Sequence, residues 1–269
     1  MKRTSQGFTL IELLVSAAIL AVLVTLLFSI VGQASRLFSR GEAQTEALGN
    51  FRAATSIIRR DLRSALLPVD RTNQNSLQFI LNPPAVSAAY KNRDALFWQC
   101  ASRSGTNTSG VSIVGYFVKW DTTDPTRPQS RLCRIAIESG NPDFLIYQNP
   151  GGWISDSVLE AVAPANKAQN YRGLLAENVI GLWITLEENE GGVIKPVDEF
   201  DSRIKGKLPV AARLSLAFLS PSGAKRMTQA DAAAIRALYQ STPATNFLAA
   251  LPAPLRPEAQ LYTTRVVLP

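Results

Sequence analysis

The amino-acid sequence predicts an α+β fold, in which a long N-terminal transmembrane helix packs on an antiparallel β-sheet domain. Three observations support this prediction. An apolar run extends from Phe8 to Val31, helical spacing of apolar residues continues to Leu67, and the rest of the chain contains several segments of strand length. The chain has 269 residues, of which 46% are hydrophobic and 18% charged, so it can form a packed core.

The first expected element is a membrane-spanning helix over residues 8–31. This run contains one charged residue, Glu12. About two dozen helical residues span roughly 36 Å, which exceeds the ~30 Å hydrocarbon layer of a bilayer. Lys2 and Arg3 precede the run, so the positive-inside rule predicts a cytoplasmic N-terminus and a periplasmic head. A secretory signal peptide would have a shorter apolar region, and a plain signal anchor would leave the carboxylate in the membrane unexplained.

The helix is expected to continue as an amphipathic half over residues 32–67. Phe51, Ile58, Leu62 and Ala65 recur at helical spacing, and the first proline of the chain is Pro68. The alternative is an ordinary linker followed by a separate helix. In either case residues 68–269 form a β-rich globular head.

The head is expected to consist mainly of strands separated by proline-rich and glycine-rich turns. One late segment, Thr228–Tyr239, has a helical pattern, with Thr228 as the N-cap and Asp231 in the first turn. The predicted strands are Leu77–Leu81, Ala95–Gln99, Val111–Trp120, Leu132–Glu138, Phe144–Gln148, Val179–Leu186, Val210–Leu219 and Leu261–Leu268.

The string Gly7-Phe8-Thr9-Leu10-Ile11-Glu12 resembles the class III signal of type IV prepilins and type II secretion pseudopilins. The resemblance implies a leader over residues 1–7, cleavage by a prepilin peptidase between Gly7 and Phe8, and N-methylation of Phe8. It also implies that Glu12 takes part in assembly. A glycine lets a protease approach the backbone closely, and pairing of Glu12 with the Phe8 ammonium of a neighbouring subunit would offset the desolvation of both charges.

A weaker resemblance concerns the later part of the chain. Three segments look like the J-type minor pseudopilin of type II secretion, in which a Leu-Pro pair introduces a strand and another strand closes the chain. The insert between Gly223 and Tyr262 is more similar to the J-like cassette protein C pilins of Verrucomicrobia. The three segments are Asn178–Trp183, Leu208–Leu216 and Arg265–Pro269.

Composition argues against an enzyme. The chain contains no histidine, so it cannot form a Ser-His-Asp relay or a His-ligated zinc site, and no spacing suggests a catalytic site, a metal site or a cofactor. The net charge of +7 suggests a nucleic-acid partner, but the basic residues form no patch interleaved with aromatic residues. A solvated basic surface is the preferred interpretation.

The cysteines, the acidic segments and the tryptophans are further candidate sites. Cys100 and Cys133 are too far apart for a C-x-x-C motif, and they either form a disulfide or are two buried thiols. Glu187–Gly192 and Asp198–Asp201 are interpreted as solvated acidic turns rather than calcium sites. Asp61 is interpreted as part of a solvated helix face, with a subunit contact as the alternative. The four tryptophans, Trp98, Trp120, Trp153 and Trp183, are expected to anchor the core.

Two functions follow from these observations. The preferred one is a structural subunit that assembles into a type II secretion pseudopilus or a type IV pilus-like fibre. Its expected partners are other pilin-like subunits, the prepilin peptidase, the inner-membrane assembly platform and the inner membrane itself. The alternative is a minor pilin whose head binds DNA, a surface or a cargo protein directly.

Overall fold

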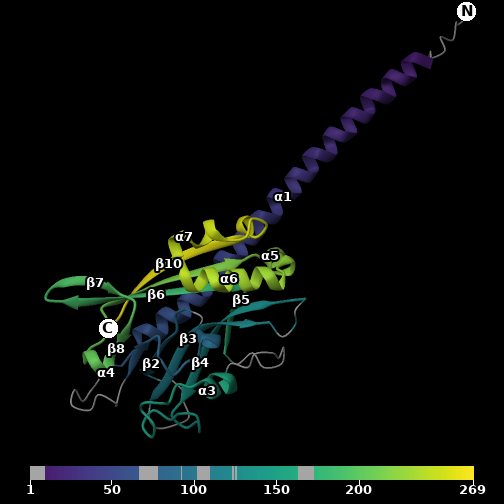
Figure 1. Ribbon diagram of the computed structural model, residues 1–269. Coiled ribbons are helices and arrows are strands. Elements are labelled where there is room, and N and C mark those ends of the chain that lie inside the picture. The colour runs from purple at the N-terminus through teal and green to yellow at the C-terminus, as the bar shows by residue number, and fades with distance from the viewer. Residues whose placement is uncertain are drawn as a thin grey trace, which may run out of the picture. The chain divides into compact units, whose positions relative to one another are not determined.

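The computed structural model describes residues 10–66, 78–91, 93–101, 110–122, 124, 126–162 and 173–269. The chain divides into two compact units, Met1–Thr45 and Glu46–Pro269. The first unit contains the N-terminal part of helix α1, and the second contains the rest of this helix together with two sheets (Figure 1).

Helix α1 extends from Leu10 to Arg63. It contains no proline, and Gly32, Gly41 and Gly49 all face open space, where their lack of a side chain costs at most about 1 kcal/mol each. Arg60 and Arg63 lie in the last turn, where their charges interact favourably with the helix dipole. The helix is therefore continuous through residues 32–63, without the linker that was the alternative, and it ends four residues before the expected Leu67.

The first sheet has six strands in the order β5-β4-β3-β2-β1-β8, and all neighbours are antiparallel. Strand β1 pairs with Leu96–Trp98 of β2, and Ala65 forms an isolated bridge with Cys100 further along the same edge. The chain after α1 therefore pairs with a part of β2 that β1 does not reach. The strands are β1 (Phe79–Leu81), β2 (Leu96–Ala101), β3 (Val111–Asp121), β4 (Gln129–Glu138), β5 (Leu174–Glu177) and β8 (Phe200–Asp201).

The second sheet has four antiparallel strands in the order β10-β9-β6-β7. Gly191 and Gly192 both have positive φ, 60° and 90°, and they form the turn between β6 and β7. The strands are β6 (Val179–Glu190), β7 (Val193–Val197), β9 (Ala211–Leu219) and β10 (Ala259–Val267).

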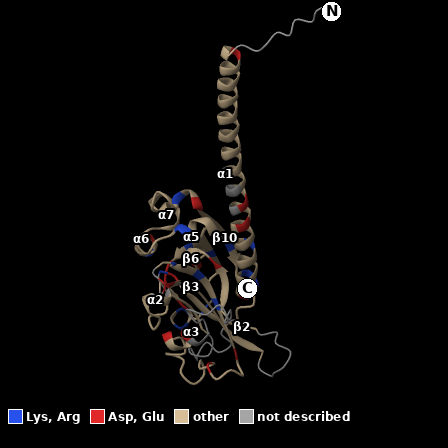
Figure 2. Cartoon of the chain, turned by 90° about the vertical axis from the view of Figure 1, so that its right-hand side faces the viewer, with Lys and Arg blue, Asp and Glu red and all other residues tan. Residues whose placement is uncertain are grey.

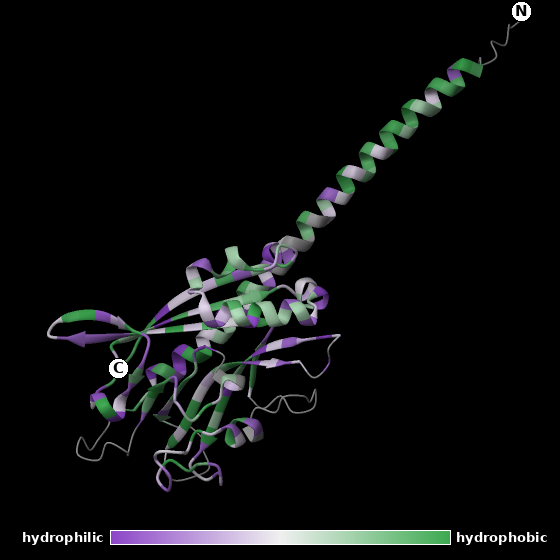
Figure 3. Cartoon of the chain, viewed as in Figure 1, coloured by the Kyte–Doolittle hydropathy of each residue, from purple (hydrophilic) through white to green (hydrophobic). Residues whose placement is uncertain are grey.

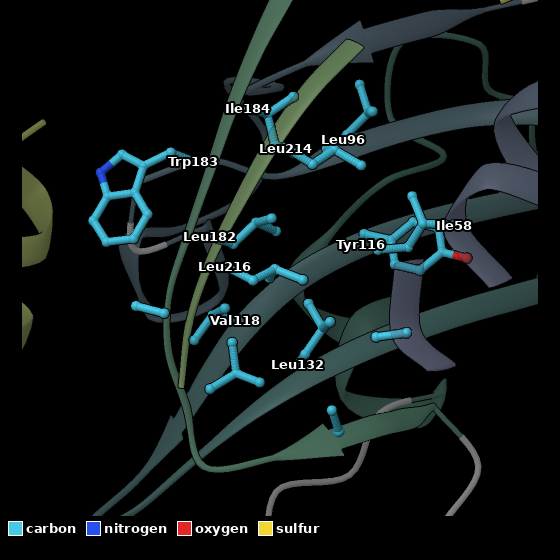
Figure 4. Packing of buried hydrophobic residues seen from close by; sticks show 14 of the residues in the cluster. Ile58, Leu96, Tyr116, Val118, Leu132, Leu182, Trp183, Ile184, Leu214 and Leu216 are labelled. Carbon is cyan, nitrogen blue, oxygen red and sulfur yellow. The ribbon is translucent and has the colours of Figure 1, made fainter. Parts of the chain in front are cut away.

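A large apolar cluster joins the two sheets and the C-terminal part of α1. Figure 4 shows Ile58 of α1 beside Tyr116 of β3, while Leu182 and Leu216 of the second sheet lie near Val118. A second cluster covers the opposite face of the first sheet and includes Phe97, Phe117 and Trp153. The six-stranded sheet is therefore buried on both faces.

Short helices complete the head. Trp183 of β6 contacts Tyr239 and Phe247, with ring centroids 5.0 and 4.8 Å apart, so α6 and α7 pack on the four-stranded sheet. The helices are α2 (Ala88–Lys91), α3 (Asp156–Val162), α4 (Ser202–Lys205), α5 (Pro221–Arg226), α6 (Gln229–Ser241), α7 (Ala244–Ala250) and the 3-10 helix η1 (Arg256–Glu258).

The α+β fold class with antiparallel sheets is confirmed, and so is the late helix. Thr228 caps α6, and its backbone N–H donates to the Asp231 side chain, forming a capping box. The strand expected over Phe144–Gln148 is wrong. Phe144 and Ile146 are buried, but the backbone turns there, with Asn149 N–H donating to the Leu145 carbonyl. Apolar residues that cover a sheet face were mistaken for a strand.

Candidate functional site

The N-terminal part of α1 has the properties of a membrane span. Leu10–Ser35 forms 26 helical residues, and its most apolar window of 18 residues has a mean hydropathy of 2.8 and no residue buried in the protein. Its apolar side chains are exposed, including Leu10 at 85% and Phe28 at 70%. Figure 3 shows this part of the helix mostly in the colour of hydrophobic residues. Such a surface is stable only when lipid or other apolar chains cover it.

The polar side chains of this segment satisfy their hydrogen bonds within the helix. The Ser16 hydroxyl donates to the Leu13 carbonyl at 3.0 Å, and the Thr25 hydroxyl donates to the Ala21 carbonyl at 2.7 Å. Groups bonded in this way can enter a hydrocarbon layer, where unsatisfied polar groups are costly. The segment is therefore compatible with lipid along its length, apart from Glu12.

Glu12 lies in the first turn of α1, where the helix dipole favours a negative charge. Figure 2 shows no cluster of charged residues along this part of the helix, and Glu12 is the only charged residue between Leu10 and Ser35. Gly7 and Phe8, the residues of the expected cleavage site, lie outside the described residues. The structure therefore places Glu12 but not the bond that we expect a peptidase to cut.

The C-terminal half of α1 is held in the head by an apolar stripe and by contacts with β10. Ala54, Ile58 and Leu62 are buried at successive helical positions. Phe51 stacks on Tyr262 of β10 with ring centroids 5.0 Å apart, and Arg59 donates to the Thr264 hydroxyl at 3.4 Å. The amphipathic pattern of this half is thus confirmed.

Asp61 is not on a solvated helix face, and that prediction is wrong. It is 4% exposed, and its Oδ2 atom accepts hydrogen bonds from the Tyr116 hydroxyl at 2.5 Å and from Arg134 Nε at 2.7 Å. Burial and the neighbouring Asp61 carboxylate raise the pKa of the Tyr116 phenol, which keeps it a donor. Tyr116 of β3 and Arg134 of β4 are directly paired across the sheet, so two strands and α1 meet at one carboxylate.

Cys100 and Cys133 are both buried free thiols, so the structure has the second of the two expected alternatives and no disulfide. The physical reason is their position. Cys100 lies on β2 in the cluster that contacts α1, whereas Cys133 lies on β4 in the cluster on the opposite face. Strand β3 separates them, and side chains on opposite faces of a sheet cannot meet.

The two acidic segments agree in part with the expected solvated turns, since Glu190, Asp198 and Glu199 are exposed. Glu187 and Glu188 are buried: Glu187 is bound by Arg265 and Arg213, and Glu188 by Lys207 and Lys205. Hydrogen bonds from these cations lower the pKa of both glutamates. Asp201 caps α4 by accepting from Arg203 N–H. Within the described residues, no group of three or more His, Cys, Asp and Glu side chains could hold a metal ion.

The tryptophans anchor the core as expected, since all four are at most 7% exposed. Trp98 stacks on Tyr116, and the Trp153 indole N–H donates to the Gln78 side chain at 2.7 Å.

The partners of Asp61 were missed by sequence reasoning, because no local pattern reveals which residues of two strands lie opposite each other. Arg134 lies between Cys133 and Ile135, both buried, and a charged residue at such a position was the available signal that it has a partner.

Comparisons with known proteins agree with the N-terminal motif. A family model described as the prokaryotic N-terminal methylation motif matches residues 2–28. This confirms the resemblance that was drawn from the residues between Gly7 and Glu12.

Two further proteins are similar to the chain. Type II secretion system protein J of Xanthomonas campestris is 31% identical over 118 residues, which cover 43% of this chain and 54% of that protein. The chain therefore spans about half the length of this relative. A type IV-like pilin from Thermus thermophilus is similar in structure, with a TM-score of 0.38 and 13% identity, over 83% of this chain and 95% of the pilin. The chain thus carries the N-terminal methylation motif of pilin-like proteins and is similar to a J-type pseudopilin.

Proposed function

We propose that this protein is a minor pseudopilin, a structural subunit that assembles into a type II secretion pseudopilus or a type IV pilus-like fibre. One observation carries the proposal: an exposed apolar helix of 26 residues bears a single carboxylate, directly after the Gly7-Phe8 motif. The similarity to protein J supports the same conclusion. A soluble protein that neither enters a membrane nor assembles would leave this apolar surface exposed to water, which is unfavourable.

Processing begins assembly in this proposal. A prepilin peptidase cuts between Gly7 and Phe8, and the new amino group of Phe8 becomes methylated. The Glu12 carboxylate of one subunit then pairs with the Phe8 ammonium of its neighbour. A carboxylate in hydrocarbon costs several kcal/mol unless it is paired, so pairing favours the assembled state.

The proposed topology follows from charge. Lys2 and Arg3 hold the leader, residues 1–7, on the cytoplasmic side of the inner membrane. Residues 8–31 span the membrane, the helix continues to Arg63, and the head over residues 68–269 is periplasmic. The partners are other pilin-like subunits, the peptidase and the assembly platform of the inner membrane.

The experiment is a measurement of intact mass and N-terminal sequence after co-expression with a prepilin peptidase. The wild-type chain should begin at methylated Phe8. The Gly7→Leu variant should keep its leader, since a side chain at this position blocks the close approach of the protease. A wild-type chain that retains residues 1–7 beside an active peptidase would leave a signal-anchored periplasmic domain, and the proposed function would be withdrawn.

A further inference from the structure

A groove of about 800 Å³ lies in the head between the last turns of α1 and the adjoining strands of the six-stranded sheet. One wall is formed by Arg59, Arg60 and Arg63 of α1. Arg134 and Glu138 of β4 line the other side. Its volume is within the range of roughly 300–1,000 Å³ that is usual for a bound small molecule or short segment. All the lining residues belong to the unit Glu46–Pro269.

The floor of the groove consists of short side chains. Ala101, Ser112 and Ala136 lie there together with Cys100 and Val114. Ala136 is exposed although it lies on the face of the sheet that is buried elsewhere under α1 and the second sheet. A polypeptide backbone can therefore approach the sheet closely at this place.

The charge of the groove is basic. Four arginines line it against two carboxylates, and one of these carboxylates, Asp61, is already bound by Tyr116 and Arg134. Among the described residues, the Arg134 side chain donates hydrogen bonds only through its Nε atom, so its terminal nitrogens remain to bind a carboxylate. Arg63 is exposed and makes no hydrogen bond or ion pair with any described residue. Figure 2 colours the Lys and Arg residues of α1 blue.

The backbone hydrogen-bonding groups on the edge of β2 at the groove already have partners. Leu66 N–H donates to the Gln99 carbonyl at 3.0 Å, and Ala101 N–H donates to the Ser64 carbonyl at 3.0 Å. These bonds close the edge of β2, so a partner cannot add a strand there. Recognition must come from side chains, and the available donors are arginines.

We propose that this groove binds an acidic peptide segment of a partner protein, whose carboxylates pair with Arg59, Arg60, Arg63 and Arg134. Charge complementarity selects this occupant, and the short side chains of the floor admit its backbone. Glu138 of β4 repels a further acid, so the carboxylates of the segment lie at the four arginines. This site is separate from the apolar helix on which the proposed function rests.

The test is fluorescence anisotropy with the full-length protein in detergent micelles. The probe is a labelled octapeptide of alternating glutamate and glycine, and its control is the same peptide with glutamine. The groove variant carries Arg59→Gln, Arg60→Gln and Arg63→Gln. A matched variant carries Arg52→Gln, Lys225→Gln and Arg236→Gln, which remove the same charge from residues outside the groove.

The groove variant should lose about tenfold in affinity and the matched variant about twofold or less, because only the first loses direct charge pairs. Ala136→Trp fills the floor without changing the charge and should also weaken binding, whereas Ala233→Trp on α6 should not. Equal losses in the two triple variants, or equal binding of the glutamine peptide, would overturn the proposal. So would displacement of the probe by phosphate or phosphatidylglycerol at lower concentrations than by unlabelled peptide.

Discussion

The Arg134 Nε atom donates a 2.7 Å hydrogen bond to the Asp61 Oδ2 atom, which joins the last turn of α1 to strand β4. The Tyr116 hydroxyl donates to the same oxygen atom at 2.5 Å. The helix that carries the apolar segment Leu10–Ser35 therefore ends in a buried charge pair.

Asp61→Asn should destabilise the head by about 3 kcal/mol, because it leaves the half-buried Arg134 without its counter-charge. Urea unfolding followed by tryptophan fluorescence measures this change, since all four tryptophans lie in the head. Arg60→Gln is the matched control. Arg60 is 70% exposed and 3.5 Å from Asp61, so its loss should cost at most about 0.5 kcal/mol. Similar costs for the two variants would contradict the importance of the buried pair.

Glu187→Gln should lower stability at neutral pH by about 1 kcal/mol. Glu187 bridges Arg213 and Arg265, two like charges that are directly paired across β9 and β10. The hydrogen bond from Arg265 holds the pKa of Glu187 below its ordinary value of 4.5. Its contribution is therefore present above pH 4.5 and is lost as pH falls through the lower, folded-state pKa. Urea midpoints of the wild type and the variant should converge in acid, and a constant difference would count against the prediction.

Gly115→Ala should destabilise the head by about 1–3 kcal/mol, because the added methyl group would overlap sterically with the Phe97 ring. A Cβ atom placed there would be 2.2 Å from Phe97 Cδ1, and this ring is fully buried. Gly49→Ala on α1 has the opposite expectation. Nothing lies within 4 Å of its Cβ position, so alanine should stabilise the helix by up to about 1 kcal/mol. Thermal unfolding measures both changes: the midpoint temperature should fall for Gly115→Ala and rise for Gly49→Ala.

Both thiols should be detected without reductant. Because Cys100 and Cys133 lie in clusters on opposite faces of the sheet, alkylation of the protein in denaturant should add two labels per chain. Mass spectrometry of protein isolated under oxidising conditions measures this number. A chain with no added label would mean that the two cysteines are bonded, and the arrangement of β2, β3 and β4 would have to change.

Glu12→Gln should leave cleavage intact but prevent assembly, since the amide cannot pair with the ammonium of a neighbouring Phe8. Co-expression with the peptidase and shearing or cross-linking of the fibre measure the two steps separately. Glu42→Gln changes the same charge further along α1 and should assemble normally. Normal assembly of the Glu12→Gln chain would argue that the carboxylate has another role.

The apolar helical segment and its continuation were predictable because both depend on local pattern. A long apolar run and a stripe at helical spacing can be recognised within a short stretch of sequence, without information about the rest of the chain. The late helix was predictable for the same reason, since Thr228 and Asp231 form its capping box within one turn.

The role of Asp61 was not predictable in this way. Its neighbours Arg59, Arg60 and Arg63 made it look like one charge on a solvated face, and its true partners lie 55 and 73 residues further along the chain. Glu187 and Glu188 were misread for the same reason. Their cations come from β9, β10 and the segment before β9, so only the sheet order brings the charges together.

Strand β3 supplies apolar side chains alternately to the two clusters, Val114 and Val118 to one and Ile113 and Phe117 to the other. A shift of β3 by one residue would exchange these sets and still bury apolar side chains on both faces. Hydrophobic patterning therefore selects the alignment of this strand only weakly. The shift would turn the Tyr116 hydroxyl away from Asp61 and leave a buried carboxylate short of a donor. This polar contact, together with the space that Gly115 leaves for the Phe97 ring, thus distinguishes two alignments that both bury apolar side chains.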